Sequence, residues 1–199
     1  MLVSEKASIM GQSRIWNTKD GMPMNSTRNS PGTVLAVCLK EQPGLPKLPV
    51  SQVNLVKGRG VKGDYHAGKN IRHRYLARKD PTRLNNRQVL VVDREIHGYI
   101  QRQGISLQPG ELGENILLDG VDLMALEIGT QLEIGPTLIE LTEIREPCSQ
   151  LDGVHPGLHR AVEIRTTTGV RPYAGMLGVI LKGGEVQPGD RVHVILKQG

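Results

Sequence analysis

Short apolar runs separated by turn-forming residues make up most of the chain after residue 32. These runs are rich in Val, Ile and Leu and are bounded by Gly, Pro, Asn or Asp, which is the pattern of β-strands. Such short runs are typical of a sheet built from many strands rather than of packed helices. Four of them predict separate strands: residues 33–40, 51–56, 87–93 and 112–120.

Two further pairs of apolar runs predict β-hairpins. The pairs are residues 130–135 with 137–145 and residues 176–186 with 190–196. Gly135 and Pro136 form the turn signal of the first pair, and the sequence QPGD lies within the second. Residues 94–104 differ, because their apolar side chains recur at helical spacing, and they predict a helix that ends at Gly104.

The composition supports a fold made mainly of strands. Aromatic residues are only 3% of the 199 residues and Phe is absent, so the core depends on aliphatic side chains. The 24 Gly and 12 Pro indicate many turns, and two QPG sequences are expected at the corners of a closed sheet. We predict a mainly β fold, a closed or partly open β-barrel with a few short helices. Residues 1–32 are expected to be a flexible tail before one domain over residues 33–199.

The charge pattern has a structural and a functional explanation. The net charge is +5, and the densest basic cluster covers residues 57–83. A solvated surface is the simpler explanation of such a cluster. The functional alternative is an anionic ligand, for which a phosphate-bearing small molecule fits as well as nucleic acid does. We do not expect nucleic acid as a partner, because few aromatic side chains are present for base stacking. No stretch is long and apolar enough to span a bilayer, and two cysteines far apart favour a reducing, cytoplasmic setting.

The two cysteines lie in contrasting contexts. Cys38 lies inside an apolar run and is expected to be buried and inert, whereas Cys148 follows Pro147 where a strand ends. A zinc site with His155 and His159 would lack the usual fourth ligand, and a nucleophile activated by one of these histidines would need it within hydrogen-bond reach. The third alternative is a thiolate that binds a soft metal.

Two polar motifs are candidates for ligand contacts. The sequence GVKGDYHAG holds Asp64 and His66 among glycines that allow backbone amides to approach an anion, although a turn capped by the aspartate explains it too. The sequence ELGEN places Gly113, Glu114 and Asn115 at the start of a predicted strand. The amide of Asn115 suits the edge of a polar ring, or it supports a neighbouring loop through hydrogen bonds.

Taken in order, six segments of the chain resemble the MOSC domain family, named for the C-terminal part of molybdenum cofactor sulfurases. The resemblance runs from about residue 33 to the C-terminus. It rests on the order of the motifs, with GEN before a strand and PC after a hairpin. The segments are GVKGDYHAG, RQVLVVDRE, LQPGELGENILLDGVDL, IGTQLEIG, LIELTEIREPC and LKGGEVQPGDRV.

The resemblance implies a barrel-like fold and a site for the molybdenum cofactor, molybdopterin. The family's PC cysteine, a molybdenum ligand or persulfide carrier, falls on Cys148. Glu114 and Asn115, with Gly113, are then expected near the pterin, and Asp64 and His66 in the same cleft. For the cofactor's phosphate we consider the basic residues Lys69, Arg72 and Arg87. The segment after Cys148, residues 149–177, matches the family least.

Two functions are compatible with this resemblance. In the first, the protein is a molybdenum-dependent oxidoreductase that reduces N-hydroxylated small molecules and receives electrons from a separate reductase, because the sequence has no flavin, haem or iron–sulfur signature. In the second, Cys148 carries sulfur as a persulfide, or the domain holds cofactor for delivery. A standalone domain without its own pyridoxal-phosphate lysine domain would then depend on a separate cysteine desulfurase.

Overall fold

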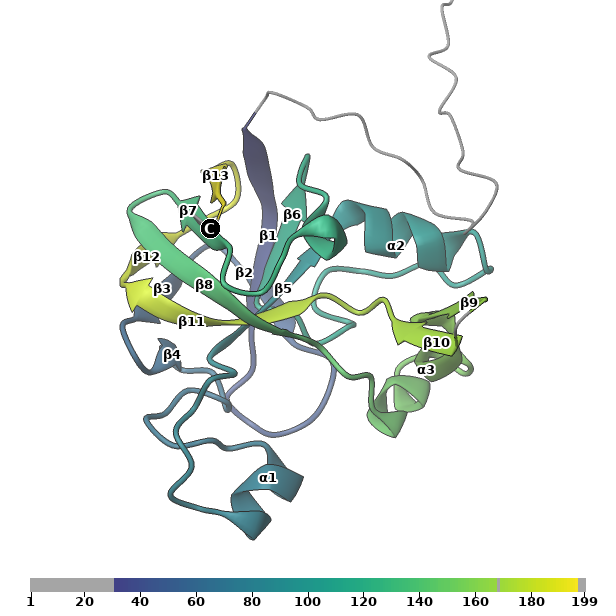
Figure 1. Ribbon diagram of the computed structural model, residues 1–199, viewed down its shortest axis with the longest axis horizontal. Helices are drawn as coiled ribbons and strands as arrows, with labels where there is room; N and C mark the ends of the chain where they lie inside the picture. Colours follow the sequence, from purple (N-terminus) through teal and green to yellow (C-terminus); the bar gives the residue numbers. More distant parts are fainter. Residues whose placement is uncertain (1–30, 168, 197–199) are drawn as a thin grey trace, which may run out of the picture.

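A closed β-barrel dominates the computed structural model, which describes residues 31–167 and 169–196 (Figure 1). The barrel strands are β1 (Gly32–Leu39), β5 (Val89–Asp93), β6 (Ile116–Asp119), β7 (Gln131–Ile134), β8 (Thr137–Ile144), β11 (Met176–Lys182) and β13 (Arg191–Ile195). They are hydrogen-bonded in the order β13-β7-β8-β11-β5-β6-β1, and pairing between β13 and β1 closes the ring. The neighbours are antiparallel except for the parallel pair β5 and β6. The predicted mainly β barrel is therefore confirmed in its closed form.

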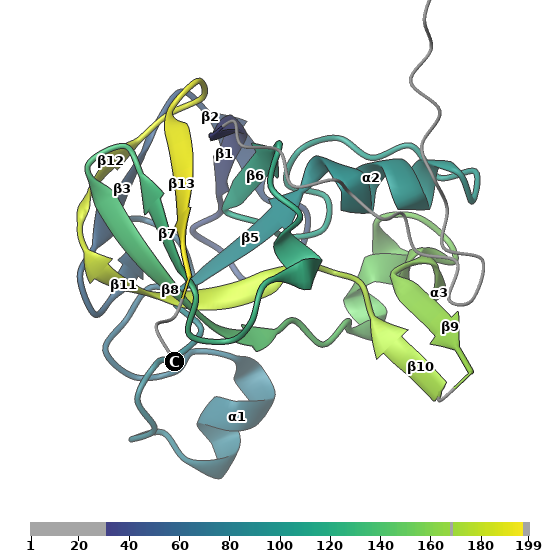
Figure 2. The same ribbon diagram turned by 45° about the horizontal axis from the view of Figure 1, so that its top comes forward.

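The other strands and the helices are not part of the closed ring of strands. The remaining strands are β2 (Leu48–Val50), β3 (Val53–Val56), β4 (Gly60–Val61), β9 (Glu163–Thr166), β10 (Gly169–Pro172) and β12 (Gly184–Val186). The helices are α1 (Arg74–Lys79), α2 (Arg94–Gln101) and α3 (Leu158–Ala161), with the 3-10 turns η1 (Leu123–Ala125) and η2 (Ser149–Gly153). In Figures 1 and 2, α1 projects from one side of the barrel, away from α2, α3 and the β9–β10 hairpin.

The core has two parts because several barrel strands are covered on both faces. In β5 all five residues are buried, and their side chains alternate between two clusters. Val89 and Val91 belong to the cluster that fills the barrel, while Leu90 and Val92 pack with Ile96 and the rest of the second cluster. This double burial explains why residues 87–93 form a continuous apolar run rather than an alternating one.

The local predictions agree with the structure where the signal lies within one segment. The strands β7 and β8 form the predicted hairpin, with Ile134 paired to Thr137 across the turn. Helix α2 begins at Arg94 as predicted but ends at Gln101, and a turn leads on to Gly104, whose φ is 91°. The side chain of Asp93 caps α2 by accepting a hydrogen bond from the backbone N–H of Ile96 at 2.9 Å.

The second predicted hairpin is wrong. Strand β11 pairs with β5 and β8, β12 leaves the barrel to pair with β3, and β13 pairs with β7 and β1. The QPGD turn reverses the chain between β12 and β13, but it does not decide which strand accepts the hydrogen bonds on either side. Those partners are set by long-range closure of the barrel, which a local turn signal does not encode.

The tail expected over residues 1–32 lies almost wholly outside the described residues. Its last residue, Gly32, already belongs to β1 and is paired with Val192 of β13. A helix long and apolar enough to cross a membrane does not occur in residues 31–167 or 169–196.

Candidate functional site

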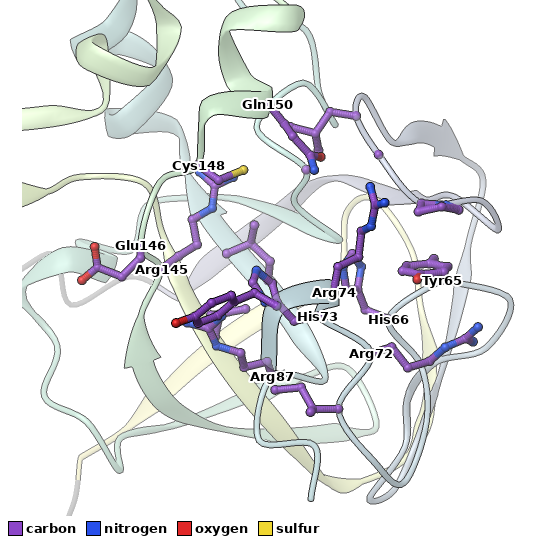
Figure 3. Close-up of a pocket in the computed structure, with 18 of the residues that line it drawn as sticks. Tyr65, His66, Arg72, His73, Arg74, Arg87, Arg145, Glu146, Cys148 and Gln150 are labelled. Atoms are coloured by element: carbon purple, nitrogen blue, oxygen red, sulfur yellow. The ribbon is translucent and has the colours of Figure 1, made fainter. Parts of the chain in front are cut away.

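A pocket of about 440 Å³ opens between the barrel and the segment that carries α1 (Figure 3). Its wall is assembled from the segment after β8, the start of β5, the loop before β2, the turn before β6 and the segment around α1. A volume of this size is within the range of small-molecule and cofactor sites in proteins. The pocket therefore collects residues that are far apart in the sequence.

Cys148 lies on the wall of this pocket. Strand β8 ends at Ile144, and the extended backbone of Cys148, with φ −127° and ψ 156°, leads into η2. Leu151 in η2 is fully buried in the second core cluster, which fixes the turn directly after the cysteine. The thiol is thus half-buried and displayed in a pocket, where the sequence predicted a loop position.

Cys38 has the opposite environment. It is fully buried in β1, and burial, reinforced by the nearby carboxylate of Glu114, raises the pKa of its thiol to about 12. A thiol with so high a pKa is almost entirely protonated at neutral pH and is a poor nucleophile. This position matches the inert structural role expected from its apolar run.

Iodoacetamide should modify Cys148 of the native protein and leave Cys38 unmodified. The reaction is run at about pH 7.5, between neutrality and the ordinary pKa of a thiol. Peptide mapping by mass spectrometry would identify the labelled cysteine. The variant Cys148→Ser should show almost no labelling under the same conditions, whereas Cys38→Ser should be labelled like the wild type. Labelling of Cys38 before Cys148 would contradict the assignment of Cys148 as the accessible thiol.

Most of the charged side chains on the pocket wall are cationic. The basic residues in the wall are Lys47, Arg72, Arg74, Arg78, Arg87 and Arg145. One carboxylate, Glu146, joins them among the described residues that line the pocket. Lys47 and Arg87 are neutralised by carboxylates behind the wall, and the guanidinium of Arg72 stacks on the Tyr65 ring at 4.7 Å. The remaining excess of positive charge favours an anionic ligand.

Arg87 is held by an ion pair rather than left free for a ligand. Its Nε and Nη2 donate to the two carboxylate oxygens of Glu143 on β8, at 2.6 and 3.2 Å. This bidentate contact orients the guanidinium between β5 and β8. Arg87 therefore borders the pocket, but part of its hydrogen-bonding capacity is already used by Glu143.

The three residues of the GEN motif lie at different depths relative to the pocket. Gly113 and Asn115 line the pocket, while Glu114 is fully buried behind it. The amide of Asn115 accepts a hydrogen bond from the Leu90 N–H at 3.2 Å and donates to the Cys38 carbonyl and to Asp64 Oδ2, both at 3.1 Å. These polar atoms bind β5, β1 and the glycine-rich loop, which is the supporting role weighed for this residue.

Glu114 joins a buried polar group near the second core cluster. Its Oε1 accepts a hydrogen bond from the Gly110 N–H at 2.7 Å and lies 3.5 Å from His97 Nε2. Its other carboxylate oxygen is buried and has no hydrogen-bond partner among the described residues. The structure therefore places Glu114 one layer behind the pocket wall.

Asp64 organises the wall from behind and does not line the pocket. Its carboxylate is 2.7 Å from Lys47 Nζ and accepts a hydrogen bond from the His66 N–H at 3.0 Å. Burial alone would raise the pKa of Asp64, but the hydrogen bond with His66 and the Lys47 ammonium together lower it well below the ordinary range. His66 itself lines the pocket, with its ring Nδ1 3.5 Å from Asp64 Oδ1.

Several other predicted site residues lie elsewhere. Lys69 is exposed and does not line the pocket. The ring of His155 contacts Glu111 Oε2 at 3.1 Å, and the His159 backbone N–H donates to Asp152. Among residues 31–167 and 169–196, no three or more His, Cys, Asp and Glu side chains cluster as metal ligands, so a zinc site at Cys148 has no support.

The site residues predicted from the sequence did not include Lys47, His73, Arg145 or the two arginines of α1, Arg74 and Arg78. Arg145 and the α1 arginines carried detectable signals, because Arg145 is three residues before Cys148 and α1 lies in the basic cluster. Lys47 lies in a loop whose sequence has no recognisable motif, and only folding brings it to Asp64. His73 Nδ1 is buried without a hydrogen-bond partner among the described residues. Burial is the main cause that lowers the pKa of the His73 imidazole, and the positive charge of the nearby Arg87 lowers it further.

Fold and site together define a β-barrel protein with a cationic pocket that displays a single thiol. Residues 62–193 match the family described as the MOSC domain, and the chain belongs to that family. No curated protein matches the chain.

Solved structures with the same fold include two bacterial proteins. The YuaD protein from Bacillus subtilis is 21% identical, with a TM-score of 0.70 over 84% of this chain and 97% of that chain. YiiM from Geobacillus stearothermophilus is 20% identical, with a TM-score of 0.59 over 83% of this chain and 75% of that chain. At this level of identity the likeness shows the fold.

Proposed function

We propose that this protein binds the molybdenum cofactor in the pocket described above, with Cys148 as the molybdenum ligand or the sulfur-carrying thiol. The observation that carries the proposal is the presence of the half-buried thiol and the excess of cationic side chains on the walls of one pocket. Thiolates bind soft metals, and guanidinium groups bind phosphate. Membership of the MOSC family supports the same ligand.

The residues present fit the three chemical parts of molybdopterin. Its dithiolene-bound metal would use the thiol of Cys148, and its phosphate would use Arg72, Arg74 and Arg78, which lie around α1. His73 Nδ1, which has no hydrogen-bond partner in residues 31–167 and 169–196, offers a hydrogen bond to a polar ring such as the pterin. Because the polar atoms of Asn115 are bound to the scaffold, we assign that residue to shaping the pocket rather than to holding the ring.

The proposed reaction is the reduction of N-hydroxylated small molecules with electrons from a separate reductase. When bound, the cofactor supplies a metal that changes oxidation state as oxygen is removed. The chain's own residues bind and orient the ligands: the junction between β8 and η2 holds Cys148, and the cationic wall attracts negative charge. Asp64 keeps Lys47 and the glycine-rich loop in place behind the wall.

A sulfur-carrier function is the second candidate, and the display of Cys148 in an open pocket favours it. A cysteine desulfurase would hold the sulfur as a persulfide on its own cysteine. The Cys148 thiolate would attack the outer sulfur, so that a new S–S bond forms at Cys148 and the donor's S–S bond breaks to release its thiolate. The reaction needs no external oxidant, because the transferred sulfur already has the required oxidation state.

Metal analysis of protein produced in cells that make the molybdenum cofactor tests the proposal. We expect close to one molybdenum per chain in the wild type and a loss of at least about tenfold in Cys148→Ser, because serine keeps the size but is a much poorer ligand for a soft metal. Cys38→Ser is the matched control, with the same atomic change at a buried thiol, and should retain molybdenum.

The same samples distinguish the two candidate functions. Bound molybdenum together with reduction of an N-hydroxylated compound supports the oxidoreductase. A mass increase of one sulfur atom on the Cys148 peptide after incubation with a cysteine desulfurase supports the carrier. Retention of molybdenum by folded Cys148→Ser would overturn the assignment of this thiol.

A further inference from the structure

Five basic side chains lie outside the pocket and have no role in the proposed cofactor site. Residues 57–83 hold nine of the 25 lysines and arginines of the chain but only two carboxylates. Three of the nine line the pocket, and the Lys79 ammonium lies 4.6 Å from the centre of the Tyr75 ring. The remaining five are all exposed, and we call them the basic face: Lys57, Arg59, Lys62, Lys69 and Arg83.

Backbone hydrogen bonds hold the basic face beside the pocket wall. The carbonyl of Arg59, in the turn between β3 and β4, accepts a hydrogen bond from the Gly68 N–H at 2.8 Å. Arg59 and Lys62 border the same shallow hollow beside β4. The Lys69 carbonyl accepts a hydrogen bond from the N–H of Asn85 at 2.9 Å, and Asn85 lines the pocket. In Figure 1, β4 and α1 lie on the side of the barrel away from α2 and the β9–β10 hairpin.

The charges of the basic face are not neutralised within the part of the chain that the structure describes. None of the five side chains forms a salt bridge with a carboxylate there. The two carboxylates of the same segment have other partners. Asp64 is buried against Lys47, and Asp80 accepts hydrogen bonds from the N–H and the hydroxyl of Thr82. Exposed charges of one sign attract an oppositely charged surface and raise the rate of encounter with it.

The position of the basic face favours an acidic protein as its partner. Both proposed functions need a second protein, a reductase or a cysteine desulfurase, that reaches Cys148 in the adjoining pocket. Nucleic acid fits less well, because base stacking uses the faces of aromatic rings. The two tyrosines of this segment, Tyr65 and Tyr75, each already have a cation over the ring.

We infer that the basic face is the docking surface for an acidic patch on the protein that delivers electrons or sulfur to the pocket. This inference rests on the proposed function, because that function supplies the need for such a donor. The positive charges attract the donor and orient it with its reactive group toward the pocket, while the pocket itself holds the cofactor.

Binding of fluorescein-labelled poly-L-glutamate to cofactor-free protein, measured by fluorescence anisotropy at low salt, tests the surface directly. The triple variant Lys57→Glu/Arg59→Glu/Lys62→Glu reverses three exposed charges and changes no residue that lines the pocket. We expect its Kd to rise at least about tenfold, because attraction becomes repulsion. Replacing the same three residues with glutamine should give an intermediate loss, and added salt should weaken binding to the wild type.

The matched control is the triple variant Arg160→Glu/Arg165→Glu/Arg171→Glu. It makes the same change of charge at three exposed positions on α3 and the β9–β10 hairpin, away from the basic face (Figures 1 and 2). Its Kd for poly-L-glutamate should change by less than about twofold at physiological salt, since distant exposed charges are screened. Equal losses in the two triple variants would show that only net charge matters and would overturn the docking surface.

Two further probes distinguish the class of partner. A DNA duplex and vesicles that contain phosphatidylserine are tested against the wild type and the charge-reversed basic face. If either probe binds through the basic face while poly-L-glutamate does not bind, the surface belongs to a nucleic acid or a membrane, and the assignment to an acidic protein is overturned.

Molybdenum-loaded protein links the basic face to turnover. With a reductase as electron donor, the KM for the reductase should rise about tenfold when the basic face is reversed, whereas activity with dithionite, a small reductant, should be unchanged. For the carrier function, transfer of sulfur to Cys148 should slow with a cysteine desulfurase but not with cysteine persulfide. Equal rates with the protein donor in both variants and the wild type would overturn the docking role. Absence of both molybdenum and persulfide from the wild type would refute the proposed function, and the anisotropy result would still decide whether the basic face binds an acidic polypeptide.

Discussion

Replacing Asp64 with alanine should lower the free energy of unfolding by about 3–5 kcal/mol, the range for breaking a buried ion pair by removing one partner. The Lys47 ammonium, 2.7 Å away, would remain buried with an exposed fraction of 5% and without its carboxylate. The amide of Asn115 and the backbone N–H groups of Lys40 and His66 would each lose an acceptor as well. Urea unfolding at pH 7 measures the loss.

A second substitution separates the ion pair from the hydrogen bonds. Lys47→Met in the Asp64→Ala background should recover part of the stability, because it removes the charge that had become unpaired. A loss below about 1 kcal/mol in Asp64→Ala would contradict the buried pair, since that is the usual range for exposed pairs.

The pH dependence of stability gives an independent check on Asp64. Its pKa is lowered in the folded state, so its contribution is fully present above the unfolded value of about 3.9 and is lost as the pH falls below it. The difference in unfolding free energy between the wild type and Asp64→Asn should therefore narrow between pH 5 and pH 3, a range chosen around that unfolded value. A constant difference across this range would show that the carboxylate does not carry the effect.

Replacing Gly110 with alanine should cost at least about 3 kcal/mol, because backbone strain and a steric overlap act together. Gly110 has a φ of 91°, which residues with a Cβ rarely adopt. A Cβ at this position would overlap the backbone carbonyl oxygen of Lys47, which also forms the pocket wall. The same change should therefore reduce both the melting temperature and the binding of a ligand in the pocket.

Gly189→Ala is a close control for this substitution. Gly189 stands in the second QPG turn with a φ of 93°, but a Cβ there would meet no atom of the described residues within 4 Å. Its cost should be limited to the backbone strain of about 1–2 kcal/mol. Equal losses for the two variants would show that the contact of Gly110 with Lys47 has no energetic importance.

Much of the barrel was predictable because its signals are local. Residues 87–93 predicted strand β5, and the Gly135-Pro136 turn predicted the β7–β8 hairpin. Helix α2 was predicted from apolar spacing, since Ile96 and Ile100 lie one turn apart and both are buried. The pairing of β13 was not predictable in this way, because its partners β7 and β1 are chosen by closure of the whole barrel.

The candidate site was predictable only in part. The sequence alone separated Cys148 from Cys38, because a proline at the end of a strand and an apolar run are opposite environments for a thiol. The glycine-rich and GEN motifs were also recognisable in the sequence as candidates for ligand contacts. The sequence did not reveal that Asp64, Glu114 and Asn115 direct their polar atoms into the scaffold, because burial depends on neighbours from distant segments.

Local sequence is sufficient for the β-rich fold, the family resemblance, the position of Cys148 after a strand and the basic cluster, since each depends on residues close together in the chain. Long-range packing, in contrast, places the Lys47 ammonium against Asp64 and leaves Arg145 Nη1 without a hydrogen-bond partner among the described residues. The two QPG turns give the same contrast: their sequence and φ angles agree, yet only Gly110 packs against another backbone. The charge balance and free space around a side chain are properties of the assembled barrel, because they depend on which distant segments fold against it.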